Sequence, residues 1–277
     1  MRRIAFTFVV VLLAATALTI QAQETEPTAP SVPVAVRSQA ECTGFIAHPS
    51  VPRDVFVVGG ADDDFHSAVR QFTEGNSIFI STHKGENLAV GSEYSVLRPA
   101  NELFRTMNYS GERWAIHRLG KPYEDIGRVK VTHANPEGTV AKVTFSCEAI
   151  VPGDILVPFQ PRAIPQYTVS KPLDHFAPPD GNKQHGRITA TRNNYGFLGA
   201  QTVVYLNLGE NEGTKTGQRF RIYKVLPPHS TGFLTGQRTP PETIGEAVVL
   251  SVQSKSCVAL VVASYREIAA GDHVEAE

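Results

Sequence analysis

The chain has 277 residues, of which 42% are hydrophobic and 19% charged, enough to bury a core in one large domain or two small ones. Its 26 lysines and arginines are balanced by 27 acidic residues, which excludes the basic excess that binds nucleic acid phosphates. Glycine (22) and proline (19) are frequent and helical apolar spacing is scarce, which favours an all-β chain with many turns.

The amino-terminal segment is typical of an export signal. Arg2 and Arg3 precede an apolar run over residues 4–20, and Ala22 provides a small residue for cleavage. We therefore predict that residues 1–22 are a signal peptide and that the mature protein is periplasmic or secreted. The alternative is an uncleaved membrane anchor, because the run is close to the shortest length that spans a bilayer. Contact with a membrane is expected only in that case.

Two proline-rich stretches divide the rest of the chain. Residues 23–37 contain prolines and no apolar period, which predicts an extended spacer. Residues 159–183 contain a series of prolines that excludes a regular element of any length. Two folded modules are therefore predicted, over residues 38–158 and 184–277.

The two predicted modules repeat one another. Residues 126–158 align with residues 244–276 at a constant offset of 118, without a gap. Ten positions are identical in this alignment: Ile126, Gly127, Val131, Val140, Ala141, Val143, Ser146, Ile150, Gly153 and Asp154. Upstream, residues 78–98 match residues 204–224 at an offset of 126, so the first copy has a longer loop between Arg98 and Ile126. An internal duplication is the simplest explanation.

Each copy has the pattern of a small antiparallel β-barrel. The stretches GRVKVTHA and TVAKVTFSCEA alternate apolar and polar residues with period two, and GEAVVLSV and SCVALVVAS do so more loosely. Gly153 with Asp154, and Gly271 with Asp272, are expected to form the tight turn before the last strand, since glycine accepts unusual backbone angles and aspartate bonds to its own turn.

A family resemblance follows from these residues. The pattern VYLNLG…FRIYK, followed by IGEAVVLSVQ…ALVVAS…EIAAGD, resembles the C-terminal domain of the flagellar assembly protein T family and similar exported proteins of bacterial envelopes. The resemblance covers about 70 residues of the second half and, more faintly, the same span of the first. It implies SH3-like barrels with a role in envelope assembly and no catalytic role.

Three cysteines follow the signal segment. In an oxidising compartment two of them can pair, and Cys42 and Cys147 both fall in the first half, so we predict a disulfide between them. Cys257 lies in the apolar stretch CVALVVA and is expected to be a buried thiol. No two cysteines have the spacing of a zinc site, and we expect neither a metal nor another cofactor.

The familiar catalytic motifs are absent from the sequence. It contains no His-Glu-x-x-His, Gly-x-Ser-x-Gly, P-loop or dinucleotide fingerprint. The acidic run at residues 62–64 could hold calcium but lacks the spacing of a calcium loop, so a solvated turn is favoured. Cys147 with His133 could be a nucleophile and its base, although a structural role for Cys147 is favoured. We predict that the protein is not an enzyme.

The longer loop of the first copy holds the candidate binding residues. They are Trp114, which is the one tryptophan of the chain, with Arg113, His117, Arg118 and Tyr123. Aromatic rings interleaved with cations suit recognition of a glycan or a protein surface, because flat rings cover apolar area and guanidinium groups pair with carboxylates. The alternative is that Trp114 only caps its barrel.

These features predict a non-enzymatic exported protein that binds or assembles another component of the cell envelope. The expected partner is an envelope protein or peptidoglycan, and no nucleic acid. A peptidoglycan- or glycan-binding protein is the alternative, with Trp114 and its neighbours as the contact. A hydrolase of unfamiliar type is a further alternative, and it would need converging histidine and acidic side chains at the junction of the modules.

Overall fold

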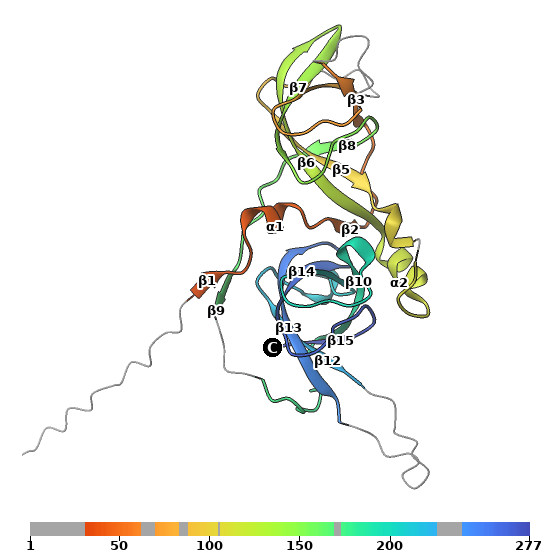
Figure 1. Cartoon of the computed structure of the whole chain (residues 1–277), viewed down its shortest axis with the longest axis vertical. Coiled ribbons are helices and arrows are strands. Elements are labelled where there is room, and N and C mark those ends of the chain that lie inside the picture. The colour runs from red at the N-terminus through yellow and green to blue at the C-terminus, as the bar shows by residue number, and fades with distance from the viewer. Residues whose placement is uncertain (1–30, 62–69, 83–87, 105, 169–172, 226–239) are drawn as a thin grey trace, which may run out of the picture.

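The computed structural model describes residues 31–61, 70–82, 88–104, 106–168, 173–225 and 240–277 (Figure 1). Its fold is all-β, with two closed antiparallel barrels of six strands in tandem, which confirms the predicted fold class. The signal segment, most of the spacer and the acidic run at residues 62–64 lie outside the described residues.

The first barrel consists of β3 (Val55–Gly60), β4 (Ser77–Thr82), β5 (Glu93–Pro99), β6 (Lys121–Asn135), β7 (Gly138–Ser146) and β8 (Ile155–Pro158). The second consists of β10 (His185–Thr191), β11 (Val203–Leu206), β12 (Arg219–Lys224), β13 (Glu242–Val252), β14 (Cys257–Ser264) and β15 (His273–Ala276). Three short strands lie outside the barrels, β1 (Ser31–Pro33), β2 (Phe45–Ala47) and β9 (Gln166–Thr168). The helices are α1 (Arg37–Glu41), α2 (Glu112–Leu119) and the 3-10 turns η1 (Asn101–Phe104), η2 (Arg192–Asn194) and η3 (Glu210–Glu212).

The two barrels have the same topology. Around the first barrel the strands follow the order β3-β4-β7-β6-β5-β8, and around the second β10-β11-β14-β13-β12-β15, which is the same order of corresponding strands. Backbone hydrogen bonds repeat as well. The amide of Gly153 donates to the carbonyl of Val57 at 2.8 Å, and that of Gly271 to Ile188 at 2.7 Å. The structure therefore contains the repeat that the two offsets in the sequence predict.

The repeated glycine and aspartate form matching corners. Gly153 and Gly271 have φ values of +92° and +96°, in the region that L side chains rarely adopt. The carboxylate of Asp154 accepts a hydrogen bond from the amide of Val151 at 2.8 Å, and that of Asp272 accepts one from Ala269 at 2.8 Å. Both residue types are thus required by the backbone of the turn.

A basic residue pairs with each corner aspartate. In the first barrel Arg98 reaches Asp154 with two nitrogens, at 2.8 and 2.7 Å. In the second, Lys224 occupies the position of Arg98, and its ammonium lies 3.6 Å from Asp272. The hydrogen bond with Asp154 raises the pKa of Arg98 above its usual value. Burial raises the pKa of Asp272, although the amide of Ala269 and Lys224 oppose this. The charges of both pairs therefore stabilise the corners, and each carboxylate already has a basic partner.

Replacing the corner glycine should destabilise the first barrel through the backbone alone. A Cβ at Gly153 would meet no atom within 4 Å, so Gly153→Ala introduces φ strain without a clash, at a cost of about 1 to 2 kcal/mol. Gly138→Ala is the matched control, since a Cβ there also has open space and no positive φ is involved. Urea denaturation should show a lower midpoint for Gly153→Ala only; equal midpoints would contradict this role of the corner.

The second barrel is apolar on its outside as well as on its inside. Its interior contains residues such as Phe220, Ile222 and Val261, whereas a second buried cluster covers its outer surface. From the barrel this cluster takes Ala190, Val203, Tyr205, Val248, Leu250, Val258 and Leu260. From the chain that precedes it, the cluster takes Val34, Ala35, Ile46, Ala100, Leu103, Ile116 and Leu119. The two modules are therefore packed against one another.

The covered outer face of the second barrel explains why apolar and polar residues alternate less strictly in the second copy. At three outward-facing positions the first copy has Lys130, Thr132 and Lys142, and the second has Val248, Leu250 and Leu260. Strands that are buried on both faces have nearly continuous apolar sequences, whereas strands with one wet face alternate. The loose pattern of GEAVVLSV and SCVALVVAS is thus the signature of an interface.

The disulfide joins the segment before the first barrel to that barrel. Cys42 follows α1 and pairs with Cys147 after β7, across 105 positions of sequence, as predicted. Beside it, Glu41 forms an ion pair with Arg128 at 2.5 Å. Cys257 is a free, buried thiol, and burial raises its pKa. The disulfide fixes the segment that also covers the second barrel.

Candidate functional site

Polar contacts complete the boundary between the modules. Tyr205 of β11 donates its hydroxyl to the carbonyl of Thr43 at 2.8 Å, and Ser256 donates to the carbonyl of Ile46 at 2.9 Å. In the linker, Arg162 pairs with Asp125 of β6 through two nitrogens at 2.6 and 2.9 Å. The buried bonds of Tyr205 and Ser256 fix how the second barrel meets the first module, and the Arg162–Asp125 pair fixes the linker on the first barrel.

Helix α2 is the part of the first module that reaches the second. It occupies the longer loop predicted for the first copy and lies beside β10 (Figure 1). Ile116 and Leu119 are buried against the outer face of the second barrel. At the start of the helix, Glu112 accepts hydrogen bonds from the amide and side chain of Asn108, whose side chain also donates to Asn194 of η2 at 2.6 Å. The helix is therefore held by apolar packing on the second barrel and, at its amino end, by hydrogen bonds that lead to η2.

Tyr109, just before α2, is a second anchor. Its ring packs on the interior cluster of the second barrel, and its hydroxyl donates to the carbonyl of Thr189 at 3.2 Å. Burial, and next the carboxylate of Glu112, raise the pKa of Tyr109 to about 12. The hydroxyl thus remains a donor throughout the physiological pH range, which supports a structural role.

A groove lies between α2 and the second barrel, which we call the Trp114 groove. Its volume is about 640 Å³, within the range of about 300–1,000 Å³ of small-molecule sites. It is lined by Tyr109, Ser110, Gly111, Trp114, Ala115, Arg118, Leu119, Arg187, Thr189, Asn207, Asn211, Glu212 and Lys255. Both modules contribute to it, so the groove exists because the barrels are docked.

The exposed groups of the Trp114 groove are an indole and cations. The side chain of Trp114 is 64% exposed, and the guanidinium carbon of Arg118 lies 4.7 Å from the centre of its ring. Within the described ranges, no carboxylate forms an ion pair with Arg118, Arg187 or Lys255. The lining carboxylate, Glu212, accepts a hydrogen bond from the amide of Gly209 at 2.7 Å and keeps its negative charge, which the three lining cations outweigh. The groove is therefore suited to an anionic ligand.

Arg113 and His117 occupy a neighbouring face of α2. Arg113 donates to the carbonyl of Phe104 at 3.2 Å, and the ring of His117 stacks on that of Phe104 with centres 4.9 Å apart. Neither residue lines the Trp114 groove. The five residues expected to bind together are thus divided, and Trp114 with Arg118 are the two that face the groove.

Tyr123 requires a correction. Its side chain is only 1% exposed, in a small core with Leu97 and Ile155, and its hydroxyl accepts a hydrogen bond from the amide of Val51 at 3.1 Å. Tyr123 belongs to β6 and packs with Leu97 and Ile155, whose chain neighbours Val96 and Leu156 are interior residues, so Tyr123 lies on the outer face of the first barrel. Residues of β2 and Val51 cover it there. It presents no surface to a ligand.

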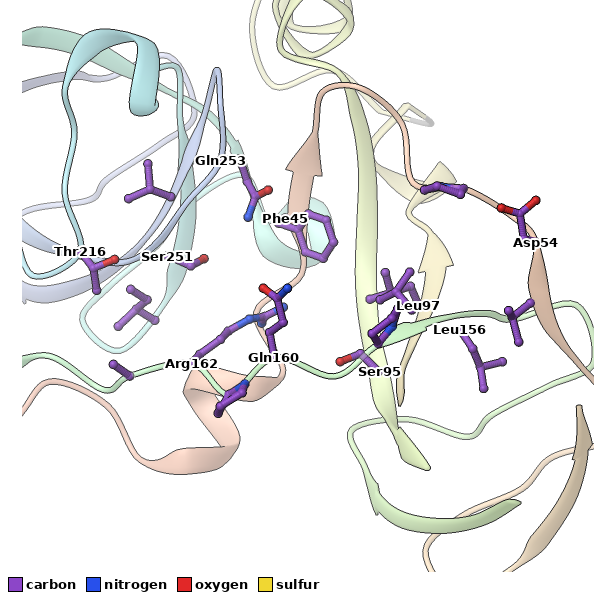
Figure 2. Close-up of a pocket in the computed structure, with 18 residues that line it drawn as sticks. Phe45, Asp54, Ser95, Leu97, Leu156, Gln160, Arg162, Thr216, Ser251 and Gln253 are labelled. Carbon is purple, nitrogen blue, oxygen red and sulfur yellow. The ribbon is translucent and has the colours of Figure 1, made fainter. Parts of the chain in front are cut away.

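A second cleft lies between the modules. It has a volume of about 880 Å³, and Figure 2 shows its lining, with Thr216, Ser251 and Gln253 from the second module and Ser95, Leu97 and Leu156 from the first. The linker that carries Gln160 and Arg162 runs between them (Figure 2). The guanidinium of Arg162 is already bound to Asp125, and the other charged residue of the lining is the carboxylate of Asp54. The cleft is a less specific candidate than the Trp114 groove.

The sequence did not indicate two cations that line the groove, Arg187 of β10 and Lys255 of the turn between β13 and β14. Neither lies in a local motif, and they meet Trp114 only through the docking of the barrels. The alternative of a Cys147 nucleophile is contradicted, because Cys147 is in a disulfide.

Among the helices in the described ranges, none is long and apolar enough to cross a bilayer. Within the same ranges, no three histidine, cysteine, aspartate or glutamate side chains gather as a metal site. No protein-family model and no curated protein matches the chain, so its function is inferred from its own residues and their geometry.

Proposed function

We propose that this protein is a non-enzymatic, exported binding module of the bacterial cell envelope. It holds another envelope component at the surface where its two barrels meet. The observation that carries this proposal is the Trp114 groove, in which an exposed indole lies beside cations that have no carboxylate partner in the described part of the chain. Exposed aromatic and arginine side chains of this kind are typical of contact residues.

Four further observations support the proposal. The apolar run over residues 4–20 supports export, and the Cys42–Cys147 disulfide is of a kind that persists in oxidising compartments. The resemblance of the second barrel to the C-terminal domain of the flagellar assembly protein T family supports a role in assembly. The partly buried ion pair at the corner of the first barrel supports a structural use of its charges, because Arg98 and Asp154 are engaged with each other.

Binding to envelope fractions tests the proposal. The mature protein, expected to begin at Gln23, should sediment with purified peptidoglycan or co-purify with an envelope protein after crosslinking in cells. Trp114→Ala should lower retention about tenfold, because it removes the exposed ring from the contact. Phe176→Ala is the control, since Phe176 is 54% exposed and does not line the groove.

Two results would contradict the proposal. Retention that is the same for Trp114→Ala and for the wild-type protein would remove the groove from the contact. Recovery of the protein in the cytoplasmic fraction, with residues 1–22 still attached, would contradict export. Retention by peptidoglycan would favour the glycan-binding candidate, and retention by a protein alone would favour an adaptor.

A further inference from the structure

We propose that the Trp114 groove is the binding site of a saccharide that carries carboxylate groups. This inference rests on the proposed function and adds to it the chemical class of the ligand. It depends on three features of the groove: the indole face, the uncompensated cations, and strand edges that are already paired.

The indole provides a platform for a sugar ring. Arg118 lies over the ring of Trp114, with 4.7 Å between its guanidinium carbon and the ring centre. An aromatic ring has two faces, and the 64% exposure of Trp114 leaves apolar area open to a ligand. The C–H face of a pyranose is flat and weakly apolar, and it can cover such a ring while its hydroxyl groups remain at the rim.

The cations determine the charge of the ligand. Arg118 comes from α2, whereas Arg187 comes from β10 and Lys255 from the turn after β13, so they approach the groove from both modules. Guanidinium groups bind carboxylates through two parallel hydrogen bonds, which fixes orientation as well as charge. Glu212, the lining carboxylate, accepts the amide of Gly209 and leaves the lining with three cations against one carboxylate. This excess of positive charge favours an acidic sugar over a neutral one.

The polar lining favours a saccharide over an acidic peptide. An extended peptide binds most readily by adding a strand to an open sheet edge. At the groove this mode is closed, because β10 pairs with β11 on one side and with β15 on the other. Ser110, Asn207 and Asn211 instead offer hydroxyl and amide groups, which suit the many hydroxyls of a sugar.

The docked barrels hold these groups in place before a ligand arrives. Ile116 and Leu119 are buried under α2, and Tyr109 is bonded to the second barrel, so the platform and the cations belong to one packed unit. Preorganised sites lose less conformational entropy on binding. The inference therefore requires both modules of the mature protein.

Fluorescence titration of the mature protein gives a direct test. The chain has one tryptophan, so any change in indole emission reports on the groove itself. Oligogalacturonate is the probe, and its methyl ester is the matched control, since it has the same rings without the charge. We expect saturable binding of the acid that weakens with salt, and binding of the ester that is weaker by about tenfold.

Variants assign the contacts, with binding measured by calorimetry. Trp114→Ala, Arg118→Gln and Arg187→Gln should each weaken binding of oligogalacturonate about tenfold. Arg113→Gln is the matched control on the same helix, because Arg113 contacts Phe104 and does not line the groove. Circular dichroism of each variant verifies the fold. Soluble peptidoglycan fragments form a parallel arm, which separates a cell-wall ligand from a uronate polymer, and binding of either acid supports the inference.

The inference is overturned if the ester binds as tightly as the acid, if Arg113→Gln and Arg187→Gln have equal effects, or if poly-glutamate binds as tightly as the saccharide. Its failure can be distinguished from that of the proposed function. If neither saccharide binds while retention of an envelope protein still depends on Trp114, the saccharide is excluded and the binding module remains. If Trp114 affects neither measurement, both are excluded.

Discussion

The double variant Cys42→Ala, Cys147→Ala is expected to be less stable than the wild-type protein by about 2 to 5 kcal/mol. The bond closes a loop of 105 positions, and its loss allows the unfolded chain far more conformations. It also releases α1, whose Glu41 pairs with Arg128. Guanidinium denaturation of the oxidised protein and the variant measures the difference.

Reduction provides an internal control for this prediction. Dithiothreitol should lower the denaturation midpoint of the wild-type protein to near that of the double variant, and should leave the variant unchanged. Cys257 is buried and is not in a disulfide, so it adds no reducible bond. A wild-type midpoint that is insensitive to the reductant would contradict a stabilising disulfide.

Leu260→Lys is expected to separate the two modules. Leu260 is fully buried in the cluster on the outer face of the second barrel, and a lysine there would lose its apolar contacts and bury an ammonium without a partner. The cost should be about 3 kcal/mol or more. Because the side chain points away from the barrel interior, the barrel itself should remain folded. Small-angle scattering should show a longer particle, and trypsin should cleave the linker faster.

The first copy provides the matched control. Lys142 occupies the position of Leu260 in the first barrel and is exposed, so Lys142→Leu should change stability by no more than about 0.5 kcal/mol. Neither scattering nor proteolysis should change in this variant. If Leu260→Lys leaves the scattering profile and the cleavage rate as they are in the wild-type protein, the packed interface is contradicted.

The barrels could be predicted from the sequence because their requirements are local and occur twice. A positive φ at Gly153 and at Gly271 requires glycine, and the neighbouring aspartates bond to their own turns. The alternation in β6 and β7 follows from a dry inside and a wet outside. The pairing of Cys42 with Cys147 followed from their place in one module.

The docking of the modules was present in the sequence but was not recognised. Leu260 stands where the first copy has Lys142, and a systematic loss of outward-facing polar residues in one of two related copies indicates a covered face. The outward-facing positions carry this signal, whereas the identities between the copies are concentrated at interior and corner positions.

The composition of the groove could not be predicted from local sequence. Arg187 of β10 and Lys255 of the turn between β13 and β14 reach Trp114 only because α2 lies against the second module. Tyr123 shows the opposite error, since it is close to α2 in sequence but is buried between the outer face of the first barrel and the segment around β2. Proximity along the chain does not predict which side chains face the groove, because that depends on the orientation of each side chain.

The covered face of the second barrel has a consequence for the order of synthesis. Among the described residues, those that cover this face from outside the barrel lie between Val34 and Tyr167 and so precede the barrel in the chain. Because a polypeptide is synthesised from its amino end, the covering residues are made before the strands whose apolar outer face they cover. If the order of the modules along the chain were reversed, the second barrel would be synthesised first. Its apolar outer face would then be exposed to other nascent chains until the first module was made.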